Sequence, residues 1–134
     1  MNRRNFVRQT TATTLLTTAA GAVSISKAQD NPNDRITIGV IGVGKQGVSD
    51  FTKAMRMPQT QMVAMCDVVA ERKENGKKIA NDFYAKLNNQ PDYDGISVHE
   101  DFREVIANEK IDAVMVVTPD HWHAVMAIYC AKKK

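Results

Sequence analysis

The sequence predicts an α/β domain built on a doubly wound parallel sheet. From residue 35 onward, short apolar runs alternate four times with segments whose apolar residues recur at helical spacing. The first apolar run ends at a glycine-rich stretch, residues 42–47, and the second ends at an acidic residue. Because crossovers between parallel strands are right-handed, such alternation places helices on the faces of one sheet. The 134 residues allow one modest domain.

The first half of this region supplies two strand–helix units. Residues 35–41 form an apolar, β-branched strand, and residues 45–57 a helix that a proline then ends. Residues 61–66 form the second strand, and residues 70–87 a long helix that Gly76 weakens. The side chains expected to face the sheet from these two helices are Val48, Phe51, Met55, Ile79, Phe83 and Leu87.

The second half supplies two further units. We expect a short strand at 96–98, a short helix at 101–108, a strong strand at 113–117 and a helix from residue 121 to the end, with Asp120 as its cap. The side chains expected to face inward from these helices are Phe102, Val105, Ile106, Trp122, Val125, Met126, Tyr129 and Cys130. The fold predicted is thus incomplete, covering about the first four strand–helix units of the sheet.

Residues 1–28 have the layout of an export signal. They contain the pair Arg3-Arg4, a weakly apolar stretch, and small residues before a cleavage point after Ala28. This layout resembles the twin-arginine signal and predicts an exported, periplasmic or extracytoplasmic protein. The alternative is a disordered or helical tail. Residues 29–34 are expected to be a linker, and residues 35–134 the folded domain.

The charge balance gives no support for a nucleic-acid partner. The net charge is +3, but residues 1–28 hold four basic residues and no acid, which leaves 14 basic and 15 acidic residues beyond them. No run of about 20 apolar residues is present, so no membrane span is expected. Cys66 and Cys130 both lie among apolar residues, which favours two buried free thiols, although an oxidising compartment would permit a bridge.

The stretch Gly42-Val43-Gly44-Lys45-Gln46-Gly47 is a G-x-G-x-x-G motif placed between a buried strand and a helix. In such a motif Gly42 permits a tight turn, Gly44 lets a pyrophosphate approach the backbone, and Gly47 allows close helix–strand packing. The amides of the loop and of the first helical residues, Lys45 and Gln46 among them, would hold the phosphates. The alternative for the glycines is a generic strand-to-helix turn.

Asp67 completes the dinucleotide-binding fingerprint. It lies 20 residues beyond Gly47 at the end of the second strand, where a carboxylate accepts hydrogen bonds from the adenine ribose. Its charge would repel a 2′-phosphate, so the sequence predicts a Rossmann-type domain that binds NAD in preference to NADP. A turn residue or helix cap is the alternative for Asp67. Arg72 would soften the preference if it lay near the ribose, but the interpretation favoured for it is a solvated helix residue.

Residues 117–123, VTPDHWH, follow the strand beyond the switch point of the sheet, where ligands bind in doubly wound folds. An open polar turn here suits the nicotinamide side of a cofactor. His123 is equally compatible with a cofactor contact and with a helix surface, whereas His121 and Trp122 are expected to be packing or rim residues. Two histidines at i and i+2 do not share a helix face, so no metal site is predicted.

Together these motifs resemble the Gfo/Idh/MocA oxidoreductases. The resemblance rests on residues 38–44 with Gly47, on Cys66-Asp67, on residues 111–114, and on Thr118-Pro119 with His123. It implies an N-terminal Rossmann domain for NAD or NADP and a C-terminal domain that binds a sugar-like substrate and often forms the interface of a homo-oligomer.

Carried over by position, the resemblance implies that Thr118, Pro119 and His123 flank the nicotinamide and its ribose. Family members commonly have asparagine where this chain has Asp120. The family continues with a Glu-Lys-Pro motif whose lysine serves substrate and catalysis, and this chain ends before it. We therefore expect a fragment with no catalytic residue of its own, an unpaired sheet edge and a tendency to self-associate.

Three functions fit these observations. The first is an NAD-dependent oxidoreductase acting on a sugar, polyol or related substrate, with this chain as its N-terminal part. The second is a glycoside hydrolase of the same family, in which tightly held NAD is used for transient oxidation. The third is a non-catalytic dinucleotide-binding module.

Overall fold

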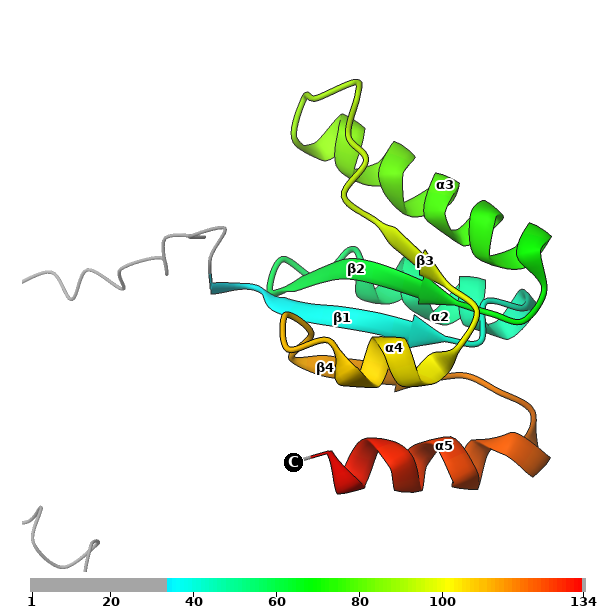
Figure 1. The fold of residues 1–134 in the computed structure, drawn as a ribbon. Helices are drawn as coiled ribbons and strands as arrows, with labels where there is room; N and C mark the ends of the chain where they lie inside the picture. Colours follow the sequence, from blue (N-terminus) through cyan, green and yellow to red (C-terminus); the bar gives the residue numbers. More distant parts are fainter. Residues whose placement is uncertain (1–33, 134) are drawn as a thin grey trace, which may run out of the picture.

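The computed structural model describes residues 34–133 (Figure 1). The export signal predicted at residues 1–28 and most of the linker lie outside this part. The described elements, in chain order, are β1 (Ile36–Ile41), α2 (Lys45–Ala54), β2 (Thr60–Cys66), α3 (Ala70–Leu87), β3 (Ser97–His99), α4 (Phe102–Ala107), β4 (Ala113–Val116) and α5 (Asp120–Lys132). The strict alternation of strand and helix is the one that the sequence predicts.

The four strands form one sheet in the order β3-β2-β1-β4, and every neighbouring pair is parallel. Side chains alternate between the faces of a strand, and the two faces bury separate apolar clusters. The helices α2 and α3 cover one face, and α4 and α5 lie against the other (Figure 1). The doubly wound α/β architecture predicted from the sequence is confirmed.

The pairing of β1 with β2 shifts by one residue between Ile38 and Gly39. Ile38 pairs with Met62 and Gly39 with Ala64, so Val63 is passed over. As a result, Met62 and Met65 both lie in the cluster under α2 and α3, although three positions separate them. A strict two-residue alternation would have turned one of these side chains to the other face.

On the face of the sheet that α2 and α3 cover, both helices differ from the sequence prediction. The predicted helix 45–57 ends at Ala54, because the Ala54 carbonyl accepts hydrogen bonds from the Met57 amide and the Thr60 hydroxyl. The helix α3 has the predicted bounds, but its buried side is Gly76, Ala80 and Tyr84. Ile79 and Phe83 lie beside that row, whereas the prediction that Leu87 faces inward is wrong, since 57% of this residue is exposed.

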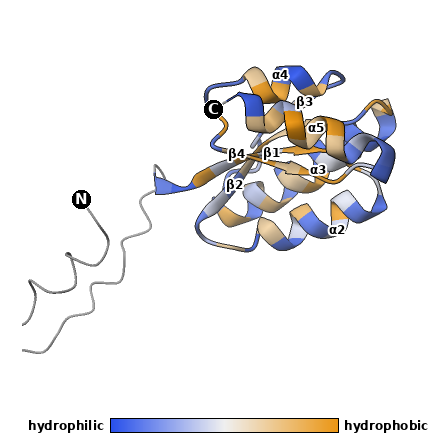
Figure 2. Cartoon of the chain, turned by 90° about the horizontal axis from the view of Figure 1, so that it is seen from below, coloured by the Kyte–Doolittle hydropathy of each residue, from blue (hydrophilic) through white to orange (hydrophobic). Residues whose placement is uncertain are grey.

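The helix α5 departs furthest from the sequence prediction. Its N-cap position is Pro119, and Asp120 is its first helical residue, so the predicted capping role of Asp120 is wrong. Met126 packs against the sheet, and the Tyr129 ring packs against the Phe102 ring with 5.4 Å between the ring centroids. Even so, α5 has no fully buried residue. Figure 2 shows apolar residues around much of this helix. Four are substantially exposed within the described part of the chain: Trp122, Val125, Ile128 and Tyr129.

Candidate functional site

The carboxyl ends of the parallel strands meet at one edge of the sheet, where three connecting loops lie together. The Gly42 amide donates to the Cys66 carbonyl at 2.8 Å, which joins the end of β1 to the end of β2. The Val117 amide donates to the Ile41 carbonyl at 2.8 Å, which joins β4 to β1. The loops after β1, β2 and β4 therefore form one continuous edge at the switch point, where ligands bind in open α/β sheets.

The three motif glycines are required for three different reasons. Gly42 has a φ of +95°, and a Cβ there would collide with the Val117 carbonyl. A Cβ on Gly47 would collide with the Gly42 carbonyl oxygen, so this glycine allows α2 to begin close to the turn. Gly44 is less crowded, because a Cβ there would have one neighbour within 4 Å, the Arg72 Nη1 atom at 4.0 Å. A ligand can thus approach the backbone at Gly44.

Asp67 lies directly behind this loop. Its Oδ2 accepts a hydrogen bond of 2.9 Å from the Val43 amide, and its Oδ1 accepts one of 2.9 Å from the Val69 amide. Only 9% of the residue is exposed. The carboxylate therefore ties the glycine loop to the start of α3, and only the remaining lone pairs on the exposed side are available to a ribose hydroxyl.

The first turn of α2 has the electrostatics of an anion site. The N-cap residue is Gly44, which supplies no side-chain acceptor, and no acidic residue occupies the first turn. The Gln46 side-chain amide is engaged with Asp50 at 2.9 Å, so it lies along the helix. Lys45 is exposed at the start of the helix. Backbone amides and the helix dipole then favour a phosphate at this end.

The loop after β4 brings Thr118 to the same place. The Thr118 methyl lies 3.2 Å from the position of a Cβ on Gly42, and its hydroxyl is buried with no hydrogen-bond partner. An unpaired buried hydroxyl is costly unless a ligand satisfies it. Pro119 ends this loop, and His123 is exposed one turn into α5 with no hydrogen bond to its imidazole among the described residues. The nicotinamide-side roles of these three residues remain predictions.

Sequence reasoning missed two neighbours of the glycine loop. A Cβ on Gly76 would lie 2.5 Å from a Val43 methyl, so this glycine lets α3 lie against the loop rather than merely weakening the helix. Arg72 lies one helical turn before Gly76 and is exposed, as the sequence predicts, but its Nη1 also lies 4.0 Å from the position of a Cβ on Gly44. Their spacing of four residues was the available signal, because it places both on one face of α3.

The cysteines are free thiols. Burial, and then the charge of Asp67, raises the pKa of Cys66 to about 11, and its thiol donates to the Glu100 carbonyl at 3.7 Å. Burial also raises the pKa of Cys130. A thiol held protonated at neutral pH is a packing group rather than a nucleophile.

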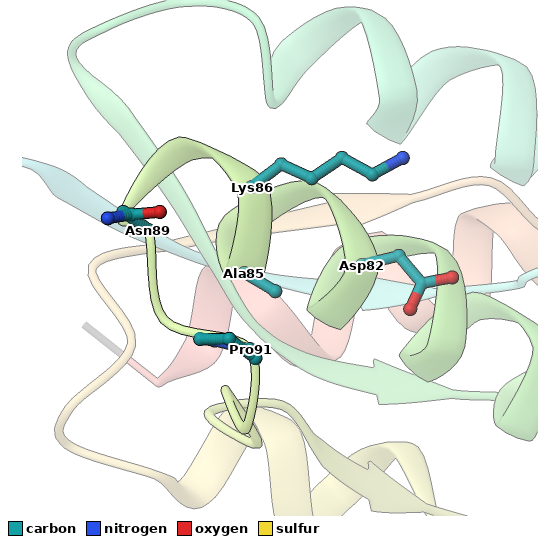
Figure 3. Close-up of a pocket in the computed structure, with 5 residues that line it drawn as sticks. All are labelled: Asp82, Ala85, Lys86, Asn89 and Pro91. Atoms are coloured by element: carbon teal, nitrogen blue, oxygen red, sulfur yellow. The ribbon is translucent and has the colours of Figure 1, made fainter.

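One pocket lies elsewhere in the fold, at the end of α3. It measures about 310 Å³ and is lined by Asp82, Ala85, Lys86, Asn89 and Pro91 (Figure 3). The glycine loop contacts α3 at Gly76, and the pocket residues on α3 lie six to ten positions further along the helix, which is roughly 9–15 Å at about 1.5 Å per residue. It is separate from the site at the carboxyl edge.

In residues 34–133, no group of three or more histidine, cysteine or acidic side chains is arranged to hold a metal ion. No helix in that range combines the length and the apolar character needed to cross a bilayer.

Comparison with known proteins agrees with this geometry. Residues 36–134 match the family model described as the oxidoreductase family with an NAD-binding Rossmann fold. Curated relatives include a glycosyl hydrolase family 109 protein of Bacteroides fragilis, 33% identical over 97 residues, and one of Porphyromonas gingivalis, 32% identical over 96. Each alignment covers 72% of this chain and 20% of the relative, so the chain spans about a fifth of the length of these proteins.

Solved structures show the same fold. The scyllo-inositol dehydrogenase of Lactobacillus casei, with bound NAD(H) and scyllo-inositol, matches with a TM-score of 0.57 and 23% identity, over 74% of this chain and 26% of that one. An NAD-binding protein of Listeria innocua matches with a TM-score of 0.56 and 24% identity, over 74% of this chain and 25% of that one. From the glycine loop, the parallel sheet and the family match, the chain belongs to the Gfo/Idh/MocA family of oxidoreductases with an NAD-binding Rossmann fold.

Proposed function

We propose that this chain supplies the dinucleotide-binding part of a nicotinamide-dependent enzyme that acts on a sugar, polyol or related substrate. The observation that carries the proposal is the hydrogen bond from the Val43 amide to Asp67 Oδ2 at 2.9 Å. It places the glycine loop beside the carboxylate at the end of the neighbouring parallel strand. A diphosphate at the loop and a ribose at the strand end would then occupy adjacent positions.

The residues at the carboxyl edge fit such a cofactor. The uncrowded backbone at Gly44 and the uncapped first turn of α2 offer amides to a pyrophosphate. Thr118, whose buried hydroxyl has no partner, lies next to Gly42 in the same loop. A bound nicotinamide would supply hydride transfer, while the chain binds and orients it. Catalytic groups and the substrate domain would come from the rest of the enzyme, for which a homo-oligomer is the proposed assembly.

We propose NAD rather than NADP as the cofactor. Asp67 places a fixed negative charge where the 2′ position of the adenine ribose would lie, and a 2′-phosphate there would meet that charge in a nearly buried setting. Arg72 opposes this effect, but its guanidinium lies next to Gly44, and no ion pair joins it to Asp67 in residues 34–133.

Isothermal titration of the 134-residue chain with NAD and with NADP tests both points. We expect NAD to bind, and to bind more tightly than NADP. A folded chain that binds neither dinucleotide would refute the proposed function. A chain that binds NADP equally well or more tightly would refute only the cofactor preference.

A glycoside hydrolase is the second candidate, and the names of the curated relatives favour it. Both relatives described above are glycosyl hydrolase family 109 proteins at 32–33% identity. An assay of the complete enzyme distinguishes the hydrolase from the dehydrogenase. The enzyme is incubated with a p-nitrophenyl glycoside, and both nitrophenol release and the absorbance of NADH at 340 nm are followed. Nitrophenol release without accumulation of NADH supports the hydrolase. NADH formation in step with oxidation of a free sugar or polyol supports the dehydrogenase.

We further propose export through the twin-arginine route, on the sequence of residues 1–28. Replacing Arg3 and Arg4 together by lysine in a reporter fusion should retain the protein in the cytoplasm, because that route requires the arginine pair. Unchanged export of the double variant would contradict the proposal.

A further inference from the structure

We propose that Arg72 is a phosphate-binding residue of this site, whose guanidinium contacts the pyrophosphate that the glycine-loop amides hold. The inference rests on the proposed dinucleotide binding and adds a residue that lies outside the glycine motif. It predicts a contact shared by NAD and NADP.

The proximity of Arg72 to Gly44 supports this role. Most of the described glycines would place a Cβ within about 2.5 Å of another atom, whereas a Cβ on Gly44 would find only Arg72 Nη1, at 4.0 Å. Gly44 is also the N-cap of α2, so the free amides of the helix start border the same space. A phosphate held by these amides would therefore lie next to the guanidinium.

The backbone of Arg72 is held by the contacts that build the loop. The Val69 amide donates to Asp67 at 2.9 Å, and the Arg72 amide donates to the Val69 carbonyl at 3.1 Å. One turn later Gly76 lies against Val43, where an added Cβ would be only 2.5 Å from a Val43 methyl. The start of α3 is therefore fixed relative to the glycine loop, and the side chain of Arg72 is directed over it.

The charge of Arg72 is available to an anion. In residues 34–133 no carboxylate oxygen lies within 4.0 Å of its guanidinium, whereas Lys73 pairs with Glu100 at 3.5 Å and Arg103 with Asp101 at 3.2 Å. Asp67 is nearby in the fold, but its two oxygens accept from backbone amides. A guanidinium with five donors and no carboxylate partner suits a phosphate.

The position of the guanidinium favours the pyrophosphate over a 2′-phosphate. The central glycine of this motif is the point where the pyrophosphate approaches the backbone, and the ribose hydroxyls lie at the end of the second strand. Arg72 Nη1 lies over Gly44, the first of these two places.

Titration of three variants with three ligands tests the proposal. The variants of the 134-residue chain are Arg72→Gln, Arg72→Lys and the control Lys78→Gln, which removes the same charge from an exposed position of α3. The ligands are NAD, NADP and ADP-ribose, which all contain the pyrophosphate. We expect Arg72→Gln to raise Kd about tenfold or more for all three, as loss of a charge-assisted hydrogen bond does. Lys78→Gln should leave Kd unchanged, and Arg72→Lys should restore part of the affinity.

Several outcomes would overturn the proposal. A loss confined to NADP would place Arg72 at the 2′-phosphate, and equal Kd values for Arg72→Gln and Lys78→Gln would show that only the helix charge matters. A wild-type chain that binds none of the ligands would refute the proposed function itself, and the Arg72 contact with it. Melting curves of the variants, which should match the wild type, separate a binding loss from a folding loss.

Discussion

The amide of Val43, in the middle of the glycine loop, donates a 2.9 Å hydrogen bond to the carboxylate of Asp67. The two residues are 24 positions apart in the sequence and belong to loops that follow neighbouring strands. The loop that would hold a diphosphate is therefore shaped in part by the residue that would hold the ribose. Because of this coupling, a change at Asp67 should affect both folding and binding, whereas a change at Gly44 should affect binding alone.

Replacing Asp67 by asparagine should reduce both stability and dinucleotide affinity. An amide oxygen can accept from one of the Val43 and Val69 amides, but the NH2 group then faces the other donor, so one buried amide loses its partner. We expect a loss of about 1–3 kcal/mol in the free energy of unfolding. Urea denaturation measures it, with Asp92→Asn, an exposed loop residue, as the charge-matched control. Equal free energies of unfolding for the two variants would contradict the role of Asp67 in holding the glycine loop.

Replacing Gly44 by alanine should affect binding and spare the fold. Its backbone angles, φ −72° and ψ −170°, suit any residue, and the new methyl would meet only Arg72 Nη1, at 4.0 Å. We expect a change in unfolding free energy of no more than about 0.5 kcal/mol, with the affinity for NAD reduced at least tenfold because the methyl occupies the pyrophosphate position. Calorimetry measures the change in affinity for NAD, and thermal melting measures the change in stability. Gly42→Ala, at a φ of +95°, should instead impair folding.

Replacing Gly76 by alanine should destabilise the domain, although alanine is the better helix former. A general preference of about 1 kcal/mol for alanine in a helix is opposed by a Cβ placed 2.5 Å from a Val43 methyl and 3.6 Å from Met65. We expect a net loss of about 1–3 kcal/mol from overpacking. Chemical denaturation checks it, with the exposed Asn75→Ala as the control that should stabilise α3 slightly. A stabilised Gly76→Ala would show that α3 does not lie close to the loop.

The thiol of Cys66 should make the domain less stable in alkali. Its pKa is raised from 9.0 to about 11 in the folded state by burial and by the charge of Asp67, so the folded chain holds the proton more tightly than the unfolded chain. The stabilisation is complete below pH 9 and is lost as the pH rises toward 11, by roughly 2 kcal/mol. Burial also raises the pKa of Tyr84, which adds a loss of the same sign. The free energy of unfolding should fall more steeply with pH in the wild type than in Cys66→Ala, and the difference between the two slopes gives the contribution of the thiol. Identical slopes would contradict the prediction.

The exposed side of α5 should promote self-association. Val125, Ile128 and Tyr129 are 40%, 53% and 44% exposed, and β4 beneath them is an edge strand of the described sheet. We expect Ile128→Lys to shift the chain toward a monomer in sedimentation velocity, with an unchanged melting temperature, because the side chain lies outside both apolar clusters. A wild-type chain that sediments as a monomer at all concentrations would refute this expectation.

Several site residues could be predicted from the sequence because their roles follow from the local geometry of a strand, a turn and a helix. The glycines at 42, 44 and 47 and the acidic residue at 67 occur at spacings that strand–turn–helix geometry imposes, and the structure places them at one edge. The inward face of α5 could not be predicted in the same way. An apolar periodicity shows which side of a helix prefers burial, but burial requires a neighbour that covers it.

The sequence by itself determined the order of the elements, the parallel α/β class and the position of the glycine loop, since each follows from periodicity and turn chemistry within a few residues. Only the tertiary structure decided that Asp67 bonds to the Val43 amide, that Gly76 lies against Val43 and that Arg72 faces Gly44. Each of these contacts joins residues from different strand–helix units. Their distance depends on how closely two helices and two strands pack, which a one-dimensional pattern does not specify.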